Sequence, residues 1–278
     1  MGYRIVMDSC GELPEELKKD PHFVLVPLTL HVGEHTVVDD DTFDQADFLV
    51  KVAACPECPK SACPSPELYM EAFGDADDVY VVTLSAKLSG SYNSACVAKM
   101  LLKEQTGKEP NVHVVDSKSA CCGETQLAYK LRDLCEQGLP FEQVVEEIEK
   151  YRDGVNTYFV LDNLETLRKN GRLTGVKALV ASTLNIKPVM GAEDGEIIQR
   201  AKTIGMKKAL NKLVEICLEE VKNPEEKRLM ITQVNCPERA EIVKKKLTAT
   251  TKFKEILVFE AAGVSSMYAN DGGVVVTV

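Results

Sequence analysis

Short apolar runs alternate with longer amphipathic segments along the first half of the chain. The apolar runs predict strands at 3–7, 24–30, 79–84 and 112–116. The amphipathic segments predict helices at 14–19, 43–53, 91–105, 124–136 and 141–151, together with one that opens at Ser65-Pro66. Thr42 and Gln45 have the spacing of a capping box for the second of these helices. Strands that alternate with helices favour a parallel sheet with helices on its faces.

The second half of the chain has a different strand spacing. It predicts strands at 157–160, 228–233, 255–259 and 274–278, helices at 164–169, 176–183, 206–221 and 237–247, and a hairpin of 186–190 with 196–200. We therefore expect two α/β domains, 1–155 and 156–278, with the ligand cleft between them. The first domain should have a mainly parallel sheet flanked by helices.

A turn rich in hydroxyl groups lies at the end of one predicted strand. The segment Ser85 to Ala95 contains Ser89, Gly90 and Ser91, and the next helix begins there. The first turn of a helix has unpaired N–H groups and a partial positive charge, so this turn can hold an oxyanion. A serine that only caps the helix is the alternative.

Three other loops carry the same residue types. The segments Asp8-Ser9, Asp116-Ser117-Lys118-Ser119 and Lys60-Ser61 are rich in hydroxyl and carboxylate groups, and the first two follow predicted strands. Ligands of parallel sheets bind beyond the carboxyl ends of the strands, so these loops should face one crevice. Asp8 and Asp116 are also expected to make ordinary turns and caps.

Composition narrows the class of protein. The chain has 278 residues and a formal net charge of −10, which argues against a nucleic-acid partner. No apolar run approaches the ~20 residues of a membrane helix, and no secretion signal is expected, so we predict a cytoplasmic protein without an integral membrane segment. Cys55, Cys58 and Cys63 form the one metal-like cluster, but without a fourth ligand we expect loop cysteines and no metal or other cofactor.

Several motifs occur in an order that resembles the DegV family. They are Asp8-Ser9-x-x-x-Leu13, Lys60-Ser61-x-x-Pro64-Ser65, Ser85-x-x-Leu88-Ser89-Gly90-Ser91-Tyr92-Asn93-Ser94, Asp116-Ser117-Lys118-Ser119, Leu167-x-x-x-Gly171-Arg172-Leu173 and Ile186-Lys187-Pro188. The resemblance covers essentially the whole chain. It implies a bacterial cytoplasmic protein of two α/β domains that binds a long-chain fatty acid. It also implies a separate fatty acid kinase, which phosphorylates the bound carboxylate to an acyl phosphate.

The resemblance places the fatty-acid site on particular residues. The carboxylate-binding hydroxyls fall on Ser61 and on Ser89, beside Gly90, and the arginine of a Gly-Gly-Arg motif falls on Arg172. Tyr268 occupies the position of a head-group histidine; it keeps a hydrogen-bond donor but adds no charge near neutral pH. Lys202 matches a basic position and is a candidate contact for the kinase. Two departures weaken the match: Asn170 replaces the first glycine, and Ala62-Cys63 replaces Ser-Gln.

Two other classes of function fit some of the same residues. A serine-dependent acyl hydrolase or transferase would use Ser89 as nucleophile and needs a base, usually histidine. His22, His31, His35 and His113 stand in no recognisable catalytic motif, and no phosphate-binding loop is present. A carrier subunit that is not itself an enzyme is therefore the main expectation. A binder of a polar carboxylate metabolite would fit the hydroxyl groups equally well.

Overall fold

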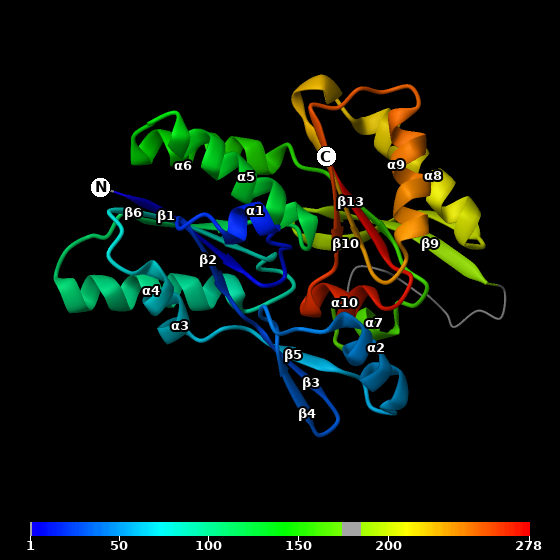
Figure 1. Ribbon diagram of the computed structural model, residues 1–278, viewed down its shortest axis with the longest axis horizontal. Helices are drawn as coiled ribbons and strands as arrows, with labels where there is room; N and C mark the ends of the chain where they lie inside the picture. The colour runs from blue at the N-terminus through cyan, green and yellow to red at the C-terminus, as the bar shows by residue number, and fades with distance from the viewer. Residues whose placement is uncertain (1, 174–184) are drawn as a thin grey trace.

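The computed structural model describes residues 2–173 and 185–278, which form two large sheets, a small third sheet and the surrounding helices (Figure 1). The first large sheet has four parallel strands in the spatial order β2-β1-β6-β7. These strands are β2 (Phe23–Val26), β1 (Tyr3–Asp8), β6 (Asp78–Thr83) and β7 (Val112–Asp116). The parallel sheet predicted for the first half of the chain is confirmed.

Helices cover both faces of this parallel sheet. In β1, Ile5 and Met7 pack toward one set of helices and Val6 packs toward the other. Side chains alternate along a strand, and all three are fully buried, which explains why the strand is a continuous apolar run. The helices are α3 (Pro66–Phe73) and α4 (Ser91–Thr106) on the Val6 side, α5 (Cys122–Glu136) and α6 (Phe141–Asp153) on the other side, and the short α1 (Glu15–Lys18) beside β2.

The second large sheet is mixed and has six strands in the order β10-β9-β8-β13-β11-β12. Strands β11 and β12 are parallel, whereas the other neighbouring pairs are antiparallel. The strands are β8 (Thr157–Val160), β9 (Ile186–Glu193), β10 (Glu196–Ile204), β11 (Arg228–Gln233), β12 (Glu255–Glu260) and β13 (Val274–Thr277). The helices of this half are α7 (Glu165–Lys169), α8 (Met206–Glu220), α9 (Pro237–Thr248), α10 (Gly263–Ala269) and a 3₁₀ turn at Pro224–Glu226.

Helix α5 lies between the two large sheets and contacts both of them. It packs against β1 and β6 of the first sheet and against β11 and β13 of the second. Its Leu127 and Leu131 belong to a buried cluster that contains Ile5 from one sheet and Met230 from the other. Polar contacts follow the same route, since Gln126 donates from Nε2 to the carbonyl oxygen of Arg228 at 2.8 Å. One hydrophobic core therefore joins the two halves, and a domain boundary at residue 155 stays a prediction.

A third sheet projects from the first half of the chain with the strand order β4-β3-β5 (Figure 1). It consists of β3 (Thr29–Val32), β4 (His35–Val38) and β5 (Lys60–Ala62), and α2 (Gln45–Ala54) precedes β5 in the chain. The sequence did not predict β5. Three residues are too few for a periodic signal, and Ser61 becomes a strand residue only because it pairs with Leu30.

The start of α2 differs from the predicted capping box. Asp44 is the N-cap and accepts a hydrogen bond from the Asp47 N–H at 3.0 Å, so the helix begins at Gln45. Thr42 instead donates its hydroxyl to Asp40 at 2.6 Å. Threonine and aspartate are both good N-cap residues, so the sequence alone did not distinguish Thr42 from Asp44. The predicted start of α3 is confirmed, since Ser65 accepts from the Leu68 N–H.

Two further predictions of the sequence concern helices. The helix expected at 176–183 lies outside the described residues. Within the described ranges, no helix is both long and apolar enough to cross a membrane. Helix α10 was not anticipated, because its seven residues contain two serines and no amphipathic repeat.

We predict that Leu127→Ala lowers the free energy of unfolding by about 3 kcal/mol, because it leaves a cavity next to both sheets. Leu127 is fully buried in the cluster that joins them. The measurement is urea unfolding followed by circular dichroism. Met100→Ala on α4 is the control, because Met100 is 62% exposed and should change stability by less than ~0.5 kcal/mol. Two separate transitions, of which the substitution shifts only one, would show that the halves do not share a core.

Candidate functional site

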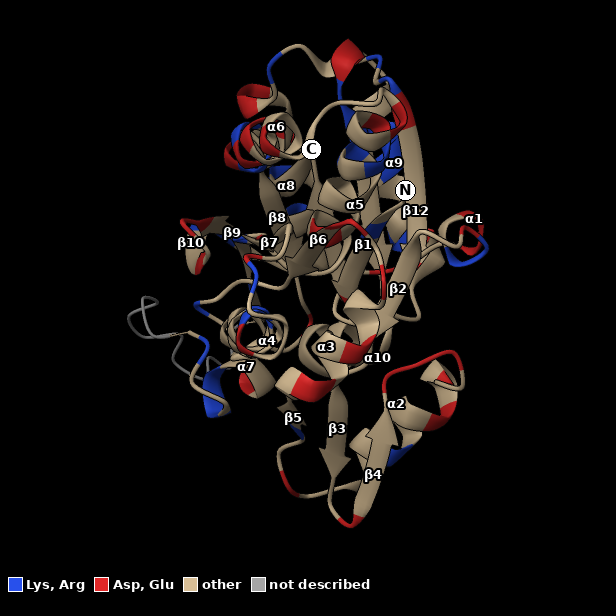
Figure 2. Ribbon diagram, turned by 90° about the vertical axis from the view of Figure 1, so that its left-hand side faces the viewer, with Lys and Arg blue, Asp and Glu red and all other residues tan. Residues whose placement is uncertain are grey.

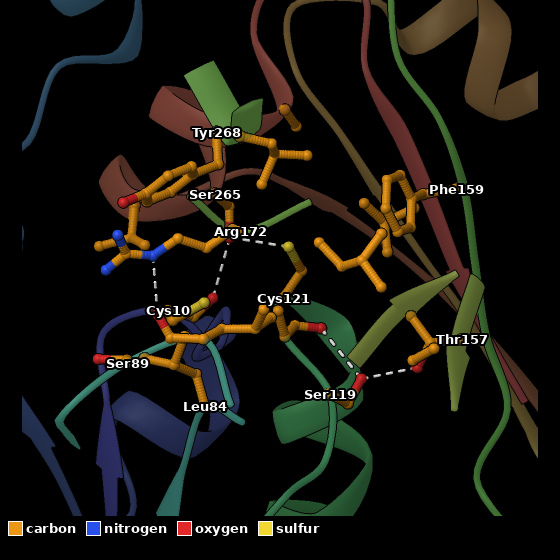
Figure 3. A pocket seen from close by; sticks show the side chains of 18 of the residues that line it. Cys10, Leu84, Ser89, Ser119, Cys121, Thr157, Phe159, Arg172, Ser265 and Tyr268 are labelled. Carbon is orange, nitrogen blue, oxygen red and sulfur yellow. Dashed lines mark hydrogen bonds between the residues drawn. The ribbon is translucent and has the colours of Figure 1, made fainter. Parts of the chain in front are cut away.

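A pocket opens between the carboxyl ends of the parallel strands and the second large sheet. It contains about 830 Å³ of empty space, its open mouth included. Arg172, Tyr268 and Ser89 lie at one side of the pocket and Phe159 and Thr157 at the other (Figure 3). Between these two sides the wall is largely apolar, with Leu28, Leu84, Leu161, Leu167, Val264 and Val275 among the lining residues. The pocket is therefore polar at one end and apolar over most of its length.

The β6–α4 turn carries Ser89 to the polar end. The buried carboxylate of Asp8 holds this turn, because its Oδ2 accepts from the Leu84 N–H at 3.0 Å and from the Ser91 hydroxyl at 2.5 Å. Ser89 lines the pocket, and its Oγ accepts from the Ser91 N–H at 3.2 Å. The local turn predicted at Asp8 is also present, because its Oδ1 accepts from the Cys10 N–H at 3.1 Å. Ser89 therefore closes the turn and lines the pocket, and its hydroxyl can still donate a hydrogen bond.

Ser61 and Tyr268 meet at the same end of the pocket. Ser61 lies on β5 and Tyr268 on α10, and their hydroxyl oxygens are 3.2 Å apart. The two residues are 207 positions apart in the sequence, so only the tertiary structure brings them together. Each hydroxyl can donate to the other or to a ligand. The sequence-predicted residues Ser61, Ser89, Arg172 and Tyr268 therefore all line one pocket.

Arg172 supplies the positive charge at the polar end. Its Nε donates to the Leu88 carbonyl oxygen at 3.0 Å, and its Nη1 donates to the carbonyl oxygen of Asn170. These partners are neutral, and no ion pair involves Arg172 within the described residues. A guanidinium has five donors in a planar fork, so N–H groups remain for an anion. Asn170, which departs from the family pattern, also donates to the Pro59 carbonyl oxygen at 2.9 Å and ties this loop to β5.

Two predicted residues lie outside the pocket lining. Gly90 is the N-cap of α4, and a Cβ on it would lie 3.1 Å from the Cys63 Sγ, so a glycine lets the loop before α3 approach this turn. Lys202 is exposed on β10, where it pairs with Pro188 of β9. Their predicted roles, a head-group contact for Gly90 and a docking contact for Lys202, stay predictions.

The sequence did not identify several lining residues. Ser265 of α10 donates to the Cys10 carbonyl oxygen at 2.9 Å and contacts the Cys121 Sγ at 3.1 Å. The hydroxyls of Ser119 and Thr157 are 2.7 Å apart and connect the two large sheets at the apolar end (Figure 3). Ser119 stands in a motif that was noticed, but α10 was not predicted, and apolar lining residues carry no local signal.

The β9–β10 turn contributes Gly195 to the pocket wall. Ser85 donates to the Gly195 carbonyl oxygen at 2.7 Å, and both residues are buried. Lys118 forms ion pairs with Asp194 at 3.2 Å and with Asp153 at 3.3 Å. Backbone and charged contacts therefore hold this turn against the strand ends of the first sheet, while the hydroxyl groups of Ser61, Ser89 and Tyr268 are partly exposed.

Asp8, Glu12, Asp39 and Glu124 are buried carboxyl groups that form no ion pair within the described part of the chain. Burial raises the pKa of Asp8 and raises the pKa of Glu124 well above its usual range, with Asp8 as the next cause for Glu124. Among the described residues, neither carboxyl oxygen of Glu124 has a hydrogen-bond partner. Burial and the nearby Asp8 therefore both favour the neutral form of the Glu124 carboxyl. Burial also raises the pKa of Glu12 to about 7 and that of Asp39 to about 6.

The histidines and the cysteine cluster lie away from the pocket lining. His22 stacks on Tyr3 with ring centroids 4.2 Å apart, and His113 contacts Glu149 at 2.9 Å. In the described part of the chain, no group of three or more His, Cys, Asp or Glu side chains is placed to hold a metal ion. The Cys58 Sγ accepts from Asn170, and Cys63 is exposed beside Gly90.

Comparison with known proteins gives consistent results. A family model described as an uncharacterised protein family, DegV, matches residues 3–278. A DegV domain-containing protein of Streptococcus pneumoniae is 36% identical over 281 residues, which cover 98% of this chain and 97% of that protein.

Solved structures resemble the whole fold. A DegV family protein of Ruminococcus gnavus, refined with vaccenic acid, superposes with a TM-score of 0.96 at 46% identity and covers 99% of both chains. The fatty acid kinase B3 protein of Streptococcus pneumoniae, loaded with linoleic acid, superposes with a TM-score of 0.90 at 33% identity. That match covers 100% of this chain and 99% of the other.

We predict that Glu12→Gln flattens the dependence of stability on pH. The pKa of Glu12 is raised from 4.5 to about 7 in the folded protein, so the folded state binds a proton more tightly than the unfolded chain. The resulting stability is fully present below pH ~4.5 and is lost as the pH rises through ~7, for a difference of about 3 kcal/mol. Urea unfolding at pH 5, 6, 7 and 8 measures this difference.

Glu104→Gln is the control for this experiment, because Glu104 is exposed on α4. It should leave the pH dependence of the wild type unchanged. If the Glu12→Gln and wild-type proteins lose stability in parallel between pH 5 and pH 8, the raised pKa of Glu12 is wrong.

Proposed function

Because this chain belongs to the DegV family, we propose that it binds one long-chain fatty acid in the pocket, with the carboxylate at the Arg172 end. The observation that carries the proposal is the division of the pocket into a polar end with Arg172 and three hydroxyl groups and an apolar remainder. A single-chain amphiphile with a small anionic head has the same division. A polar metabolite would leave the apolar wall without a partner.

The physical terms favour binding through the acyl chain. Burial of each methylene contributes roughly 0.8 kcal/mol, so an acyl chain supplies most of the binding energy. The head group is held by neutral hydroxyl donors and by a guanidinium whose described partners are carbonyl oxygens. Charge-assisted hydrogen bonds are stronger than neutral ones, so Arg172 fixes the orientation of the carboxylate. The fatty acids bound to the Ruminococcus gnavus and Streptococcus pneumoniae proteins support this assignment.

We further propose that the chain is a carrier subunit and that a separate fatty acid kinase phosphorylates the bound carboxylate. A nucleophilic serine needs a neighbouring base, and the hydroxyls of Ser61 and Ser89 contact none among residues 2–173 and 185–278. Ser61 contacts Tyr268, and Ser89 accepts from the Ser91 N–H. The four head-group side chains are partly exposed, which leaves the carboxylate accessible from the mouth. The Streptococcus pneumoniae B3 protein, a fatty acid kinase component by name, supports this role.

We predict that the protein expressed in bacteria carries one fatty acid per chain. Ser61→Ala and Ser89→Ala should each weaken binding by about 1 kcal/mol if the lost hydrogen bond is neutral and by up to ~3 kcal/mol if its acceptor is charged. Arg172→Ala should weaken it at least as much, because it removes the positive charge. Native mass spectrometry detects the bound lipid, and displacement of a fluorescent fatty acid measures the dissociation constant.

Lys202→Ala is the matched control, because it removes a cation outside the pocket and should leave affinity unchanged. Protein that stays free of ligand and takes up no added oleic acid would contradict the proposed function. Normal affinity in all three pocket variants would show that the carboxylate does not bind at Ser61, Ser89 and Arg172. Uptake of sugar acids in preference to fatty acids would favour the polar-metabolite alternative.

We predict that acyl phosphate forms only when a cognate kinase and ATP are added to the lipid-loaded protein. Hydroxylamine traps acyl phosphate as a hydroxamate that mass spectrometry detects. Lys202→Ala should bind oleic acid normally and reduce the rate of transfer, if Lys202 contacts the kinase. Hydroxamate without the kinase would make this chain the enzyme, and its absence with every cognate kinase would limit the role to storage or transport.

A further inference from the structure

Helix α10 lines the pocket, and the segment that leads into it lines a second, open cleft. From the helix, Val264, Ser265, Tyr268 and Ala269 line the pocket. From the segment before it, Ala261 and Ala262 line the cleft, together with Asp39. The remaining cleft residues include the acidic loop that leads into α2 (Figure 2). A shift of α10 would therefore move Ser265 and Tyr268 together relative to the rest of the pocket.

The helix has no capping side chain of its own. Its N-cap residue, Ala262, provides no side-chain hydrogen bond. Asp39 takes this role from 224 positions away: Oδ1 accepts from the Gly263 N–H at 2.6 Å, and Oδ2 accepts from the Val264 N–H at 2.8 Å. Without Asp39, two N–H groups of the first turn would be buried without a partner.

The Asp39 carboxylate is itself held by dipoles. It is 2% exposed, and its third hydrogen bond comes from the Ser9 hydroxyl at 3.0 Å. Asp8 and Glu12, from the end of β1 and the loop after it, raise its pKa or share its field. The cleft that Asp39 lines also carries the ionisable groups of Lys18, Asp40, Asp41, Asp44 and Glu260, and Lys18 is paired with Asp41 at 2.7 Å. Burial raises the pKa of Asp39 to about 6, while the bonds from Val264, Gly263 and Ser9 act in the opposite direction. If the Gly263 and Val264 amides moved away, the Asp39 carboxylate would keep only the hydrogen bond from the Ser9 hydroxyl.

The contact is also close enough to fix the position of the helix. A Cβ on Gly263 would lie 2.6 Å from Asp39 Oδ1 and 2.8 Å from Leu30 Cδ1, so glycine is required for this approach. Leu30 pairs with Ser61 in the third sheet, and Asp39 follows β4 of the same sheet. Asp39, which holds α10, and Ser61 are therefore both connected to the third sheet.

We propose that Asp39 is a positioning residue for the pocket, which holds the first turn of α10 so that Tyr268 faces Ser61 across the head-group end. The proposal rests on the proposed function for the identity of the ligand, a fatty acid. It assigns no contact between Asp39 and the ligand. Its consequence is that ligand affinity depends on a carboxylate that caps α10 and does not itself line the pocket.

The test compares Asp39→Asn with Asp40→Asn, which changes a neighbouring exposed acid that contacts Thr42 and not α10. Asparagine keeps the size of the side chain, but it has only one acceptor oxygen. The Gly263 and Val264 N–H groups each need an acceptor. In ligand-free protein, hydrogen exchange of the 263–269 segment should become faster in Asp39→Asn only. Oleic acid should bind about fivefold more weakly to Asp39→Asn at pH 7.5, the usual size of a lost cap.

The pH profile distinguishes positioning by the charge from a general loss of packing. Protonation makes wild-type Asp39 neutral, so the ratio of the two dissociation constants should fall from about fivefold at pH 7.5 toward one at pH 5. Ser9→Ala removes one donor and should give a smaller effect in the same direction.

Three results would overturn the proposal. They are unchanged exchange of 263–269 in Asp39→Asn, faster exchange with unchanged affinity, and an affinity ratio that does not vary with pH. If the wild type binds no fatty acid, the proposed function fails, and the exchange experiment alone still decides whether Asp39 holds α10.

Discussion

The two large sheets pack against opposite sides of α5, and this shared burial determines where a pocket can form. The helix begins at Cys122, directly after the pocket residues Ala120 and Cys121, so the strand ends of the first sheet are brought against β8 and β9 of the second. A backbone φ of +56° at Cys121 makes the sharp entry into the helix. Because α5 is buried on both sides, neither sheet can move far without exposing apolar surface.

Charge is distributed unevenly around the pocket. Beneath it, Asp8 and Asp39 are buried and held by N–H groups and hydroxyls, and burial raises the pKa of Glu124 well above its usual range. At the mouth, Arg172 donates to neutral carbonyl oxygens and keeps its positive field. The acidic groups are thus committed to the fold, whereas the guanidinium stays available for an anion. This separation suits the proposed carboxylate ligand and needs no histidine.

Local patterns predicted most of the regular structure because the strands and longer helices have clear periodicity. Two examples are set by residues close in sequence: the alternating burial of Ile5, Val6 and Met7 in β1, and the start of α3 at Ser65-Pro66. The short elements were missed for a physical reason. Strand β5 exists through its pairing with β3, and α10 exists through a cap supplied by Asp39, so neither has a local signal.

The sequence by itself determined the α/β class, the parallel first sheet, the family, and four pocket residues that stand in recognisable motifs: Ser61, Ser89, Arg172 and Tyr268. Only the tertiary structure decided that Ser61 and Tyr268 face each other, which apolar side chains form the wall, and that α10 depends on Asp39. The reason is that helices, strands and turns are set by neighbours within a few residues. A pocket is set by contacts between segments that the chain brings together only when the core around α5 is complete.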